Sequence, residues 1–458
     1  MPQMVREEIL TACRCFSVID KTATLTDLVD TEIRAEKPRA FRRIADNALA
    51  LFALQGLTYL VSFLTVPYLL RTLGTSHFGS LAFANTVMAQ FILLTDFGFA
   101  SSATRLVAIH SKDQERLGVL FSAVMTVKVL LLGLSALIVS VLAFAVPRFH
   151  GDRAVMLMAF LQVIGSVLFP GWLFQGLERM RLITVISIVA RLISTGLIFL
   201  VVHGPGDTVL SMACQSAGVV FQGLIALYFA VVVLRIRPVT AQRQEVWNQV
   251  KDSFHPFLGA SMGNLVGGSS VLFLGMFKDM ITVGGYAAIE RTARAEVLAM
   301  LPAAQAAYPH ISQRFHEGLT SGNRAFIRLS TCLLTGALLF VGGVAFFSPK
   351  ILHLLYGAKL LGESRLFSTF SIWSFLSLLN TLLGLHYLIA SGHSKAYGRS
   401  VFWSAALTIV CFVTLIPRLG SWGGLLAVIF GEVLQTVLML LAIWSINRLH
   451  QEAVTKVS

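Results

Sequence analysis

The stretch VGGYAAIERTARAEVLAMLPAAQAAY, residues 283–308, is the most informative part of this sequence. It has the length and apolarity of a membrane-spanning helix, yet it carries Glu290, Arg291, Arg294 and Glu296 near its middle. Each such charge costs at least ~2.5 kcal/mol at the centre of a bilayer. Charges at that depth normally face a water-filled cavity or pair with one another. The stretch therefore indicates a transport pathway.

The composition of the whole chain agrees with a membrane protein. Of 458 residues, 56% are hydrophobic and only 13% are charged, and the mean hydropathy is +0.76. Soluble domains carry about 25% charged residues. The apolar runs are too long and continuous for barrel strands, which alternate over ~10 residues. The sequence therefore predicts an all-α polytopic membrane protein.

The net charge of +13 does not indicate nucleic-acid binding, because the basic residues lie mainly in short segments between apolar runs. With a cytoplasmic N-terminus, the predicted inside segments hold 24 Lys and Arg residues and the outside loops hold 8. This asymmetry follows the positive-inside rule. We therefore expect a multi-pass membrane protein with both termini in the cytoplasm.

The apolar runs predict about 12 spans in two six-helix lobes. We place the spans near 44–70, 78–108, 115–145, 152–176, 180–202, 207–234, 252–278, 283–308, 323–348, 363–390, 396–417 and 420–447. The predicted organisation is a cytoplasmic extension (1–43), an N-terminal lobe (44–234), a basic cytoplasmic linker (235–251), a C-terminal lobe (252–447) and a cytoplasmic tail (448–458).

The two halves show a weak internal similarity. HFGSLAFANTV (77–87) and TVGGYAAIERT (282–292) both place glycine and an aromatic residue before a small-residue helix. Their offset is about 205 residues, near half the chain. Transporters built from internal repeats bind substrate at the repeat interface. Chance resemblance between apolar helices is the alternative.

The short loops leave no room for a soluble catalytic or nucleotide-binding domain, and no P-loop motif is present. Neither the cysteines nor the histidines show metal-site spacing. The sequence thus predicts no cofactor and no metal site. Energy for transport would come from an H⁺ or Na⁺ gradient, the membrane potential or the substrate's own gradient.

The charged stretch itself suggests a division of roles. On a helix, Glu290 and Arg294 are four residues apart and can pair, which leaves Arg291 available for an anion. The planar fork of arginine suits phosphate and carboxylate. The alternative is a self-neutralised structural cluster. Glu290 and Glu296 are also candidates for coupling or gating.

Three further charged residues within predicted spans are candidates for the site, namely Asp96, Lys128 and Arg191. Arg191 and Lys128 could join Arg291 and Arg294 in a cationic cavity that binds substrate. Asp96 either pairs with an arginine from another helix, or titrates as a coupling site. The alternative for Asp96 is a structural salt bridge near the cytoplasmic end.

The run YLLRTLGTSHFGSLAFANTVMAQFILLTDFGFASSATR, residues 68–105, resembles a known family. Its aromatic-Leu-Leu-Arg start, Leu-Gly, Phe-Gly and later Asp-Phe-Gly are similar to O-antigen and polysaccharide flippases of the Wzx type. These belong to the multidrug/oligosaccharidyl-lipid/polysaccharide exporter superfamily. More diffusely, the similarity extends over residues 40–447.

The resemblance implies a MATE-like fold and a concrete function. It implies transport of an undecaprenyl-diphosphate-linked oligosaccharide, an O-antigen or exopolysaccharide unit, from the cytoplasmic to the periplasmic leaflet. Cationic cavity residues would hold the lipid head, and acids such as Asp96 would serve coupling or gating. Besides membrane lipids, the implied partners are a polysaccharide polymerase and a chain-length regulator.

Three alternatives remain at this point. A cation-coupled drug antiporter of the same superfamily would favour acids over arginines in its cavity. A flippase for the peptidoglycan precursor is a closer variant. A membrane-embedded polysaccharide polymerase or ligase, which is an enzyme, needs a sizeable periplasmic loop, and the sequence shows none.

Overall fold

The computed structural model describes residues 56, 61, 63–145 and 151–457, and these residues form helices joined by short turns. Among them, nine helical segments are long and apolar enough to cross a membrane by length and composition. They are Thr75–Ile109, Gln114–Ala145, Arg153–Gly176, Met180–Val201, Pro205–Val233, Leu319–Phe346, Ser348–Ile389, Ser394–Leu419 and Ser421–Glu452. The prediction of an all-α polytopic membrane protein is confirmed.

The N-terminal lobe consists of the helices that precede α9. An apolar helix, Phe63–Leu73, ends before Gly74, whose φ of 83° is a conformation that glycine adopts without strain. α5 packs against both α2 and α8, and α7 packs against α8. The helices are α2 (Thr75–Asp96), α3 (Phe99–Ile109), α4 (Gln114–Ala145), α5 (Arg153–Leu168), α6 (Gly171–Gly176), α7 (Met180–Val201), η2 (Pro205–Asp207), α8 (Thr208–Tyr228) and η3 (Phe229–Val233).

The C-terminal lobe follows α9 (Arg243–Gly268). In this lobe α11 packs against α12 and α14, while α16 packs against α14 and α15. Its helices are α10 (Ser270–Phe277), α11 (Met280–Glu317), α12 (Leu319–Phe346), α13 (Ser348–Tyr356), η4 (Gly357–Glu363), α14 (Ser364–Thr381), η5 (Leu382–Ile389), α15 (Ser394–Leu419) and α16 (Ser421–Val457).

Nine of the predicted spans coincide with the nine apolar segments. The first predicted span, 44–70, lies mostly outside the described residues, as does the predicted extension 1–43. The seventh and eighth correspond to α9–α10 and α11, which are not among the nine apolar segments. For α11 the reason is the four charges within a short stretch. The number of twelve spans therefore stays a prediction.

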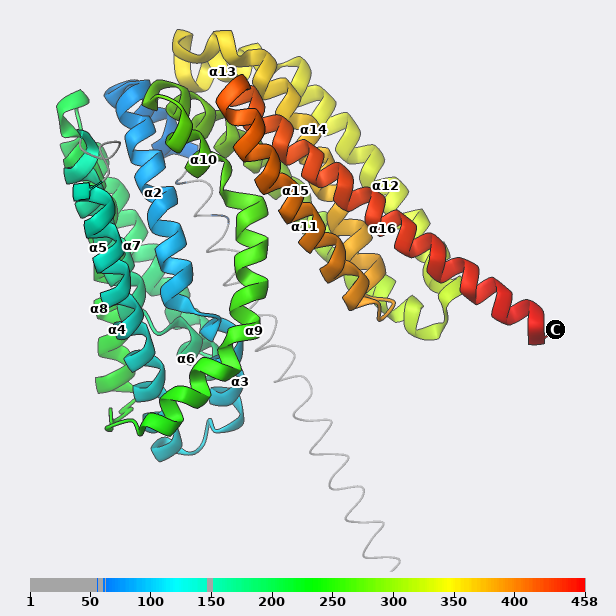
Figure 1. Ribbon diagram of the computed structural model, residues 1–458, viewed down its shortest axis with the longest axis horizontal. Helices are drawn as coiled ribbons and strands as arrows, with labels where there is room; N and C mark the ends of the chain where they lie inside the picture. Colours follow the sequence, from blue (N-terminus) through cyan, green and yellow to red (C-terminus); the bar gives the residue numbers. More distant parts are fainter. Residues whose placement is uncertain (1–55, 57–60, 62, 146–150, 458) are drawn as a thin grey trace, which may run out of the picture.

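The two lobes meet at one end of the molecule and diverge toward the other (Figure 1). We call the end where the lobes meet, and where α2 and α11 both begin, the closed end. We call the end where the lobes diverge the open end. Two hydrogen bonds cross between the lobes at the closed end. Arg71 donates to the Leu354 carbonyl at 2.5 Å, and the Lys359 ammonium donates to the Arg71 carbonyl at 2.9 Å. One hydrophobic cluster includes buried residues of α2, α11 and α14, so the lobes share a core there.

The close crossing of α2 and α11 depends on two glycines. A Cβ on Gly79 would lie 1.9 Å from the Met280 carbonyl oxygen, and a Cβ on Gly284 would lie 2.0 Å from the Thr75 carbonyl oxygen. The two contacts are reciprocal, because Thr75 and Gly79 of one helix correspond to Met280 and Gly284 of the other at the same offset. Small residues allow such close backbone approach between membrane helices.

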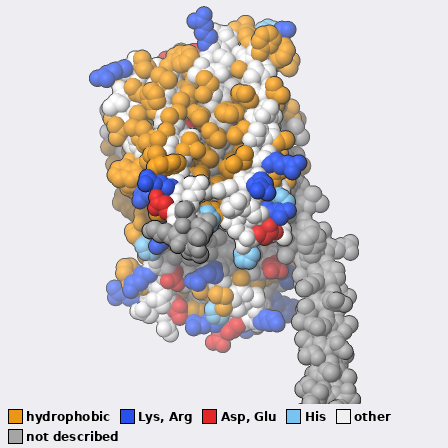
Figure 2. All heavy atoms as spheres, turned by 90° about the vertical axis from the view of Figure 1, so that its right-hand side faces the viewer, with side chains coloured by type: hydrophobic (Ala, Val, Ile, Leu, Met, Phe, Trp, Pro, Cys, Tyr) orange, Lys and Arg blue, Asp and Glu red, His pale blue; other side chains and the backbone are white. Residues whose placement is uncertain are grey.

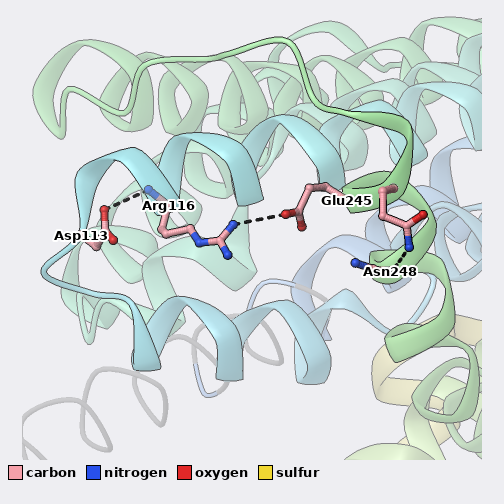
Figure 3. Close-up of polar contacts among 5 residues, drawn as sticks. Asp113, Arg116, Glu245 and Asn248 are labelled. Atoms are coloured by element: carbon pink, nitrogen blue, oxygen red, sulfur yellow. Dashed lines mark hydrogen bonds and ion pairs between the residues drawn. The ribbon is translucent and has the colours of Figure 1, made fainter.

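Helix α9 connects the lobes and is anchored to both. Near its start, Glu245 accepts a hydrogen bond from Arg116 of α4 at 3.2 Å, and the backbone N–H of Arg116 is in turn bonded to Asp113 (Figure 3). Further along, Ser253 lies 2.6 Å from Ser102 of α3. α9 also packs against α15 of the C-terminal lobe. The predicted linker 235–251 thus includes the first turns of α9, and the predicted lobe boundaries stay predictions.

Candidate functional site

A cavity of about 710 Å³ lies between the two lobes. The N-terminal lobe contributes residues of α2, α5, α7 and α8, and the C-terminal lobe contributes residues of α11 and Tyr356 of α13. The helix before α2 lines it as well. The polar and charged residues in the lining are Thr65, Asn85, Gln162, Ser187, Arg191, Ser194, Thr195, Gln215, Gln222, Arg291, Thr292, Arg294 and Tyr356.

Three arginines give the cavity its charge. Arg291 and Arg294 come from α11 and Arg191 comes from α7, so the positive charges belong to both lobes. Arg294 is bonded to Glu290 at 2.6 Å. Arg191 and Arg291 are exposed, and neither forms an ion pair with any described residue. Among the described lining residues there is no Asp or Glu. The cavity therefore suits an anion.

Aromatic rings and hydroxyl groups hold this part of α11 in place. The Arg291 guanidinium carbon lies 5.8 Å from the ring centroid of Phe78 on α2, and that of Arg294 lies 5.6 Å from the ring of Trp373. The Tyr356 hydroxyl lies 2.8 Å from the Thr292 hydroxyl. Cation–π contacts of this kind orient a guanidinium without neutralising it. Arg291 thus keeps its charge for a ligand.

Neutral amides line the cavity on the side of the N-terminal lobe, together with Arg191. Gln162 on α5 donates to Asn85 on α2 at 2.8 Å, and Asn85 donates to Gln215 on α8 at 3.2 Å. Gln222 on α8 donates to Ser187 on α7 at 2.9 Å. We call Asn85, Gln162, Gln215 and Gln222 the amide wall. Amides both donate and accept hydrogen bonds, which is what sugar hydroxyl and acetamido groups require.

The comparison with known proteins assigns the chain to a family. The sequence pattern of the family described as "Polysaccharide biosynthesis protein" matches residues 44–315. The chain belongs to this family. The matched range contains every residue that lines the cavity except Tyr356.

Two curated relatives of this chain carry the name "Putative O-antigen transporter". The one from Escherichia coli (strain K12) is 28% identical over 406 residues, which cover 86% of this chain and 95% of the relative. The one from Shigella dysenteriae is 25% identical over 405 residues, covering 87% and 99%. The family resemblance inferred from residues 68–105 is therefore confirmed.

Solved structures show the same fold at low sequence identity. "Lipid II flippase MurJ, inward closed conformation" superposes with a TM-score of 0.69 at 12% identity and covers 87% of each chain. An inward-facing multidrug resistance MATE family transporter of the MOP superfamily gives a TM-score of 0.60 at 15% identity, covering 87% of this chain and 99% of that one. These similarities confirm the predicted MATE-like fold.

The predicted site residues of this family member fall into two groups. Arg191, Arg291 and Arg294 line the cavity together. Lys128 and Asp96 do not line it, and the two form an ion pair with each other at 2.8 Å. The Lys128 ammonium also donates to the Ser166 carbonyl at 3.2 Å, and its side chain is only 1% exposed. The partner of Asp96 is thus a lysine, whereas one of the alternatives drawn from the sequence named an arginine.

Glu290 and Glu296 of α11 are buried beside the cavity rather than in its lining. Glu290 pairs with Arg294, as its spacing predicts. Glu296 accepts a hydrogen bond from Ser371 on α14 at 3.3 Å, and no described residue hydrogen-bonds to its second oxygen. The coupling roles of Asp96, Glu290 and Glu296 stay predictions.

Several cavity residues have no strong signal in the sequence. Gln162, Gln215 and Gln222 are polar residues in apolar spans, a pattern that interhelical hydrogen bonding explains equally well. Asn85 and Tyr356 look like ordinary span or loop residues. Only one feature points to Asn85, namely its place inside the 77–87 segment that resembles 282–292.

The Asp96–Lys128 pair gives an asymmetric stability prediction. Asp96→Ala leaves the buried Lys128 ammonium without its carboxylate and should lower the free energy of unfolding by about 1–3 kcal/mol. Lys128→Met replaces the buried charge by an apolar chain of similar size, and Asp96 is 46% exposed and can be hydrated, so the loss should be about 1 kcal/mol or less. Thermal unfolding of the detergent-solubilised variants measures both, and equal losses would contradict the pairing argument.

Proposed function

We propose that this protein is a flippase for an undecaprenyl-diphosphate-linked oligosaccharide, which moves from the cytoplasmic to the periplasmic leaflet of the bacterial inner membrane. The observation that carries the proposal is the interlobe cavity, which combines three arginines from the two lobes with the amide wall of the N-terminal lobe. The substrate has the same two parts, an anionic diphosphate and a neutral, hydroxyl-rich glycan. The names of the curated relatives support the same substrate class.

In this proposal the three arginines bind the diphosphate. Arg291 and Arg191, which have no ion-pair partner among the described residues, supply the unneutralised charge, and Arg294 adds hydrogen bonds. Arginine binds phosphate oxygens through paired N–H donors. The glycan contacts the amide wall, and the polyprenyl chain stays in lipid between the lobes. The lobes then rock about the bound substrate, so that the open end closes and the closed end opens.

The proposal also assigns the residue that couples transport to an ion gradient and the side of the membrane on which the termini lie. Glu296 is the favoured site for a coupling proton or Na⁺, because it is buried and has no cationic partner among the described residues. Glu290 serves the pairing of Arg294, and Asp96 with Lys128 belongs to the N-terminal lobe. We place both termini in the cytoplasm on the Lys and Arg asymmetry, and we expect a polysaccharide polymerase and a chain-length regulator to receive the product.

The rival functions differ in the charge that they require. A drug antiporter that exports organic cations needs acids in its cavity, and the described lining has arginines and no acid. A flippase for the peptidoglycan precursor handles the same diphosphate, so the distinction from it rests on the glycan. The relatives' names favour the O-antigen type over that precursor.

The test is reconstitution of the purified protein into liposomes. We expect translocation of a lipid-linked O-antigen unit, measured as the fraction that becomes accessible to a glycan-modifying enzyme on the far side. Protein-free liposomes and a cationic drug are the controls. Drug movement without glycan movement would overturn the proposal in favour of an antiporter. Faster movement of the peptidoglycan precursor than of the O-antigen unit would reassign the substrate.

A further inference from the structure

A second cavity lies far from the interlobe site, in the hairpin between α11 and α12. It measures about 750 Å³ and lies at the open end, where α11 finishes at Glu317 and α12 begins at Leu319. Gly318, with a φ of 142°, makes the sharp turn between the two helices. We call it the basic groove, and its lining is His310, Arg314, Thr320, Ser321, Arg324, Ala325, Arg328 and Leu329.

The groove has an excess of positive charge. Glu317 accepts hydrogen bonds from Arg314 at 2.8 Å and from Ser321 at 3.2 Å. The bond from Arg314 lowers the pKa of the Glu317 carboxyl, so this acid stays ionised at neutral pH and offsets Arg314. Arg324 and Arg328 are exposed and form no ion pair with any described residue. Two guanidinium charges are therefore uncompensated on one side of α12, four residues apart.

The depth of these arginines follows from the length of α12. Arg328 lies about 18 residues before the end of the helix at Phe346, which is ~27 Å at 1.5 Å per residue. The hydrocarbon core of a bilayer is ~30 Å thick. If the apolar part of α12 spans that core, Arg328 and Arg324 lie at the level of the lipid headgroups.

The surface next to the groove is apolar and exposed. Ile327 is 63% exposed, and further along α12 Leu338 and Leu339 are 60% and 74% exposed. Figure 2, which looks at the C-terminal lobe, shows a broad hydrophobic face with Lys and Arg side chains gathered below it. An anion in the groove would thus have an apolar surface directly above it. That combination fits an amphiphile better than a soluble anion.

The basic groove is separate from the interlobe cavity. The two share no lining residue. Along α11, Arg294 and His310 are about 16 residues apart, which is ~24 Å. A ligand headgroup of a few ångströms does not reach from one to the other.

We propose that the basic groove binds the phosphate headgroup of an anionic lipid in the leaflet at the open end of the molecule. Arg324 and Arg328 hold the phosphate oxygens, Thr320 offers a hydroxyl donor, and the acyl chains lie along the exposed apolar face of α12. Basic pockets between membrane helices at the headgroup level bind lipid phosphates on this principle. The inference does not depend on the proposed transport function.

The test titrates short-chain phosphatidylglycerol onto the detergent-solubilised full-length protein, with phosphatidylcholine and inorganic phosphate in parallel. The variant is Arg324→Gln with Arg328→Gln. The matched control is Lys395→Gln with Arg399→Gln, which removes two cations from the first turns of α15 at the same end of the same lobe. We expect the groove variant to weaken phosphatidylglycerol binding about 30-fold and the control to change it less than about 3-fold.

The outcomes separate the possible ligands. Equal losses in both variants mean a general surface-charge effect and overturn the groove. Inorganic phosphate that binds as tightly as phosphatidylglycerol, with loss in the groove variant, overturns the lipid assignment. Undecaprenyl phosphate, titrated in the same way, tells whether the carrier lipid or the bulk lipid is preferred, and either preference supports a lipid phosphate site. Unchanged melting temperatures confirm that both variants are folded.

Discussion

Arg291→Ala should abolish translocation of the lipid-linked glycan while the protein remains folded and inserted. Arg291 lines the cavity, has no ion-pair partner among the described residues, and is held against Phe78. Removing one member of a desolvated charge pair costs about 2–5 kcal/mol. The affinity for the diphosphate should therefore fall by about 30-fold or more. Flipping in proteoliposomes and binding of undecaprenyl diphosphate measure the two effects.

Two further variants show whether the effect belongs to Arg291. Arg291→Lys keeps the charge and loses the planar fork, so its loss should be intermediate. Arg294→Ala combined with Glu290→Ala removes a pair that neutralises itself, with little change in net charge. Its effect on diphosphate binding should be smaller than that of Arg291→Ala. Normal flipping by Arg291→Ala would contradict the assignment of the interlobe cavity as the diphosphate site.

Gly284→Ala should open the closed end of the molecule. The new methyl group would lie 2.0 Å from the Thr75 carbonyl oxygen, so α2 and α11 must move apart. Overpacking of this kind costs about 1–3 kcal/mol, which lowers the population of this conformation relative to a more open one by about fivefold or more. A cysteine placed at Ser80, a position that is 6% exposed in the present conformation, should react much faster with a soluble maleimide.

The neighbouring glycine provides a matched control. A Cβ on Gly285 would meet only Leu360, at an ordinary 3.6 Å, so Gly285→Ala should leave the Ser80 label as slow as in the parent protein. Gly79→Ala acts on the same crossing from the other helix and should mimic Gly284→Ala. The double variant should be less than additive, because one separation relieves both contacts. Equal labelling in Gly284→Ala and Gly285→Ala would contradict the close-crossing argument.

The charged stretch at 283–308 shows how far sequence alone reaches. Its four charges in an apolar helix predicted a pathway, because lipid does not tolerate unpaired charge. The i,i+4 spacing predicted the Glu290–Arg294 pair, which is local and independent of tertiary packing. The same spacing argument left Arg291 unpaired, and the structure places it in the cavity lining.

Residues far apart in the sequence were harder to place. Arg191 and Lys128 both occupy the middle of predicted spans, and the sequence gives no signal that distinguishes a cavity residue from a buried ion-pair residue. The structure turns Arg191 toward the cavity and Lys128 toward Asp96 and Ser166. The rotation of each helix about its own axis decides this, and that rotation is set by packing against α2, α5 and α8.

The sequence by itself determined the class of the protein, most of its spans and its family, because the hydrophobic effect and the cost of buried charge act on short local segments. Only the tertiary structure decided which charges share a cavity. It also brought Asn85, Gln162 and Gln215 into one wall and placed Gly79 against Gly284. These contacts join residues 77 to 205 positions apart in the sequence. The packing of helix against helix decides which of these contacts form, and no local sequence pattern encodes that packing.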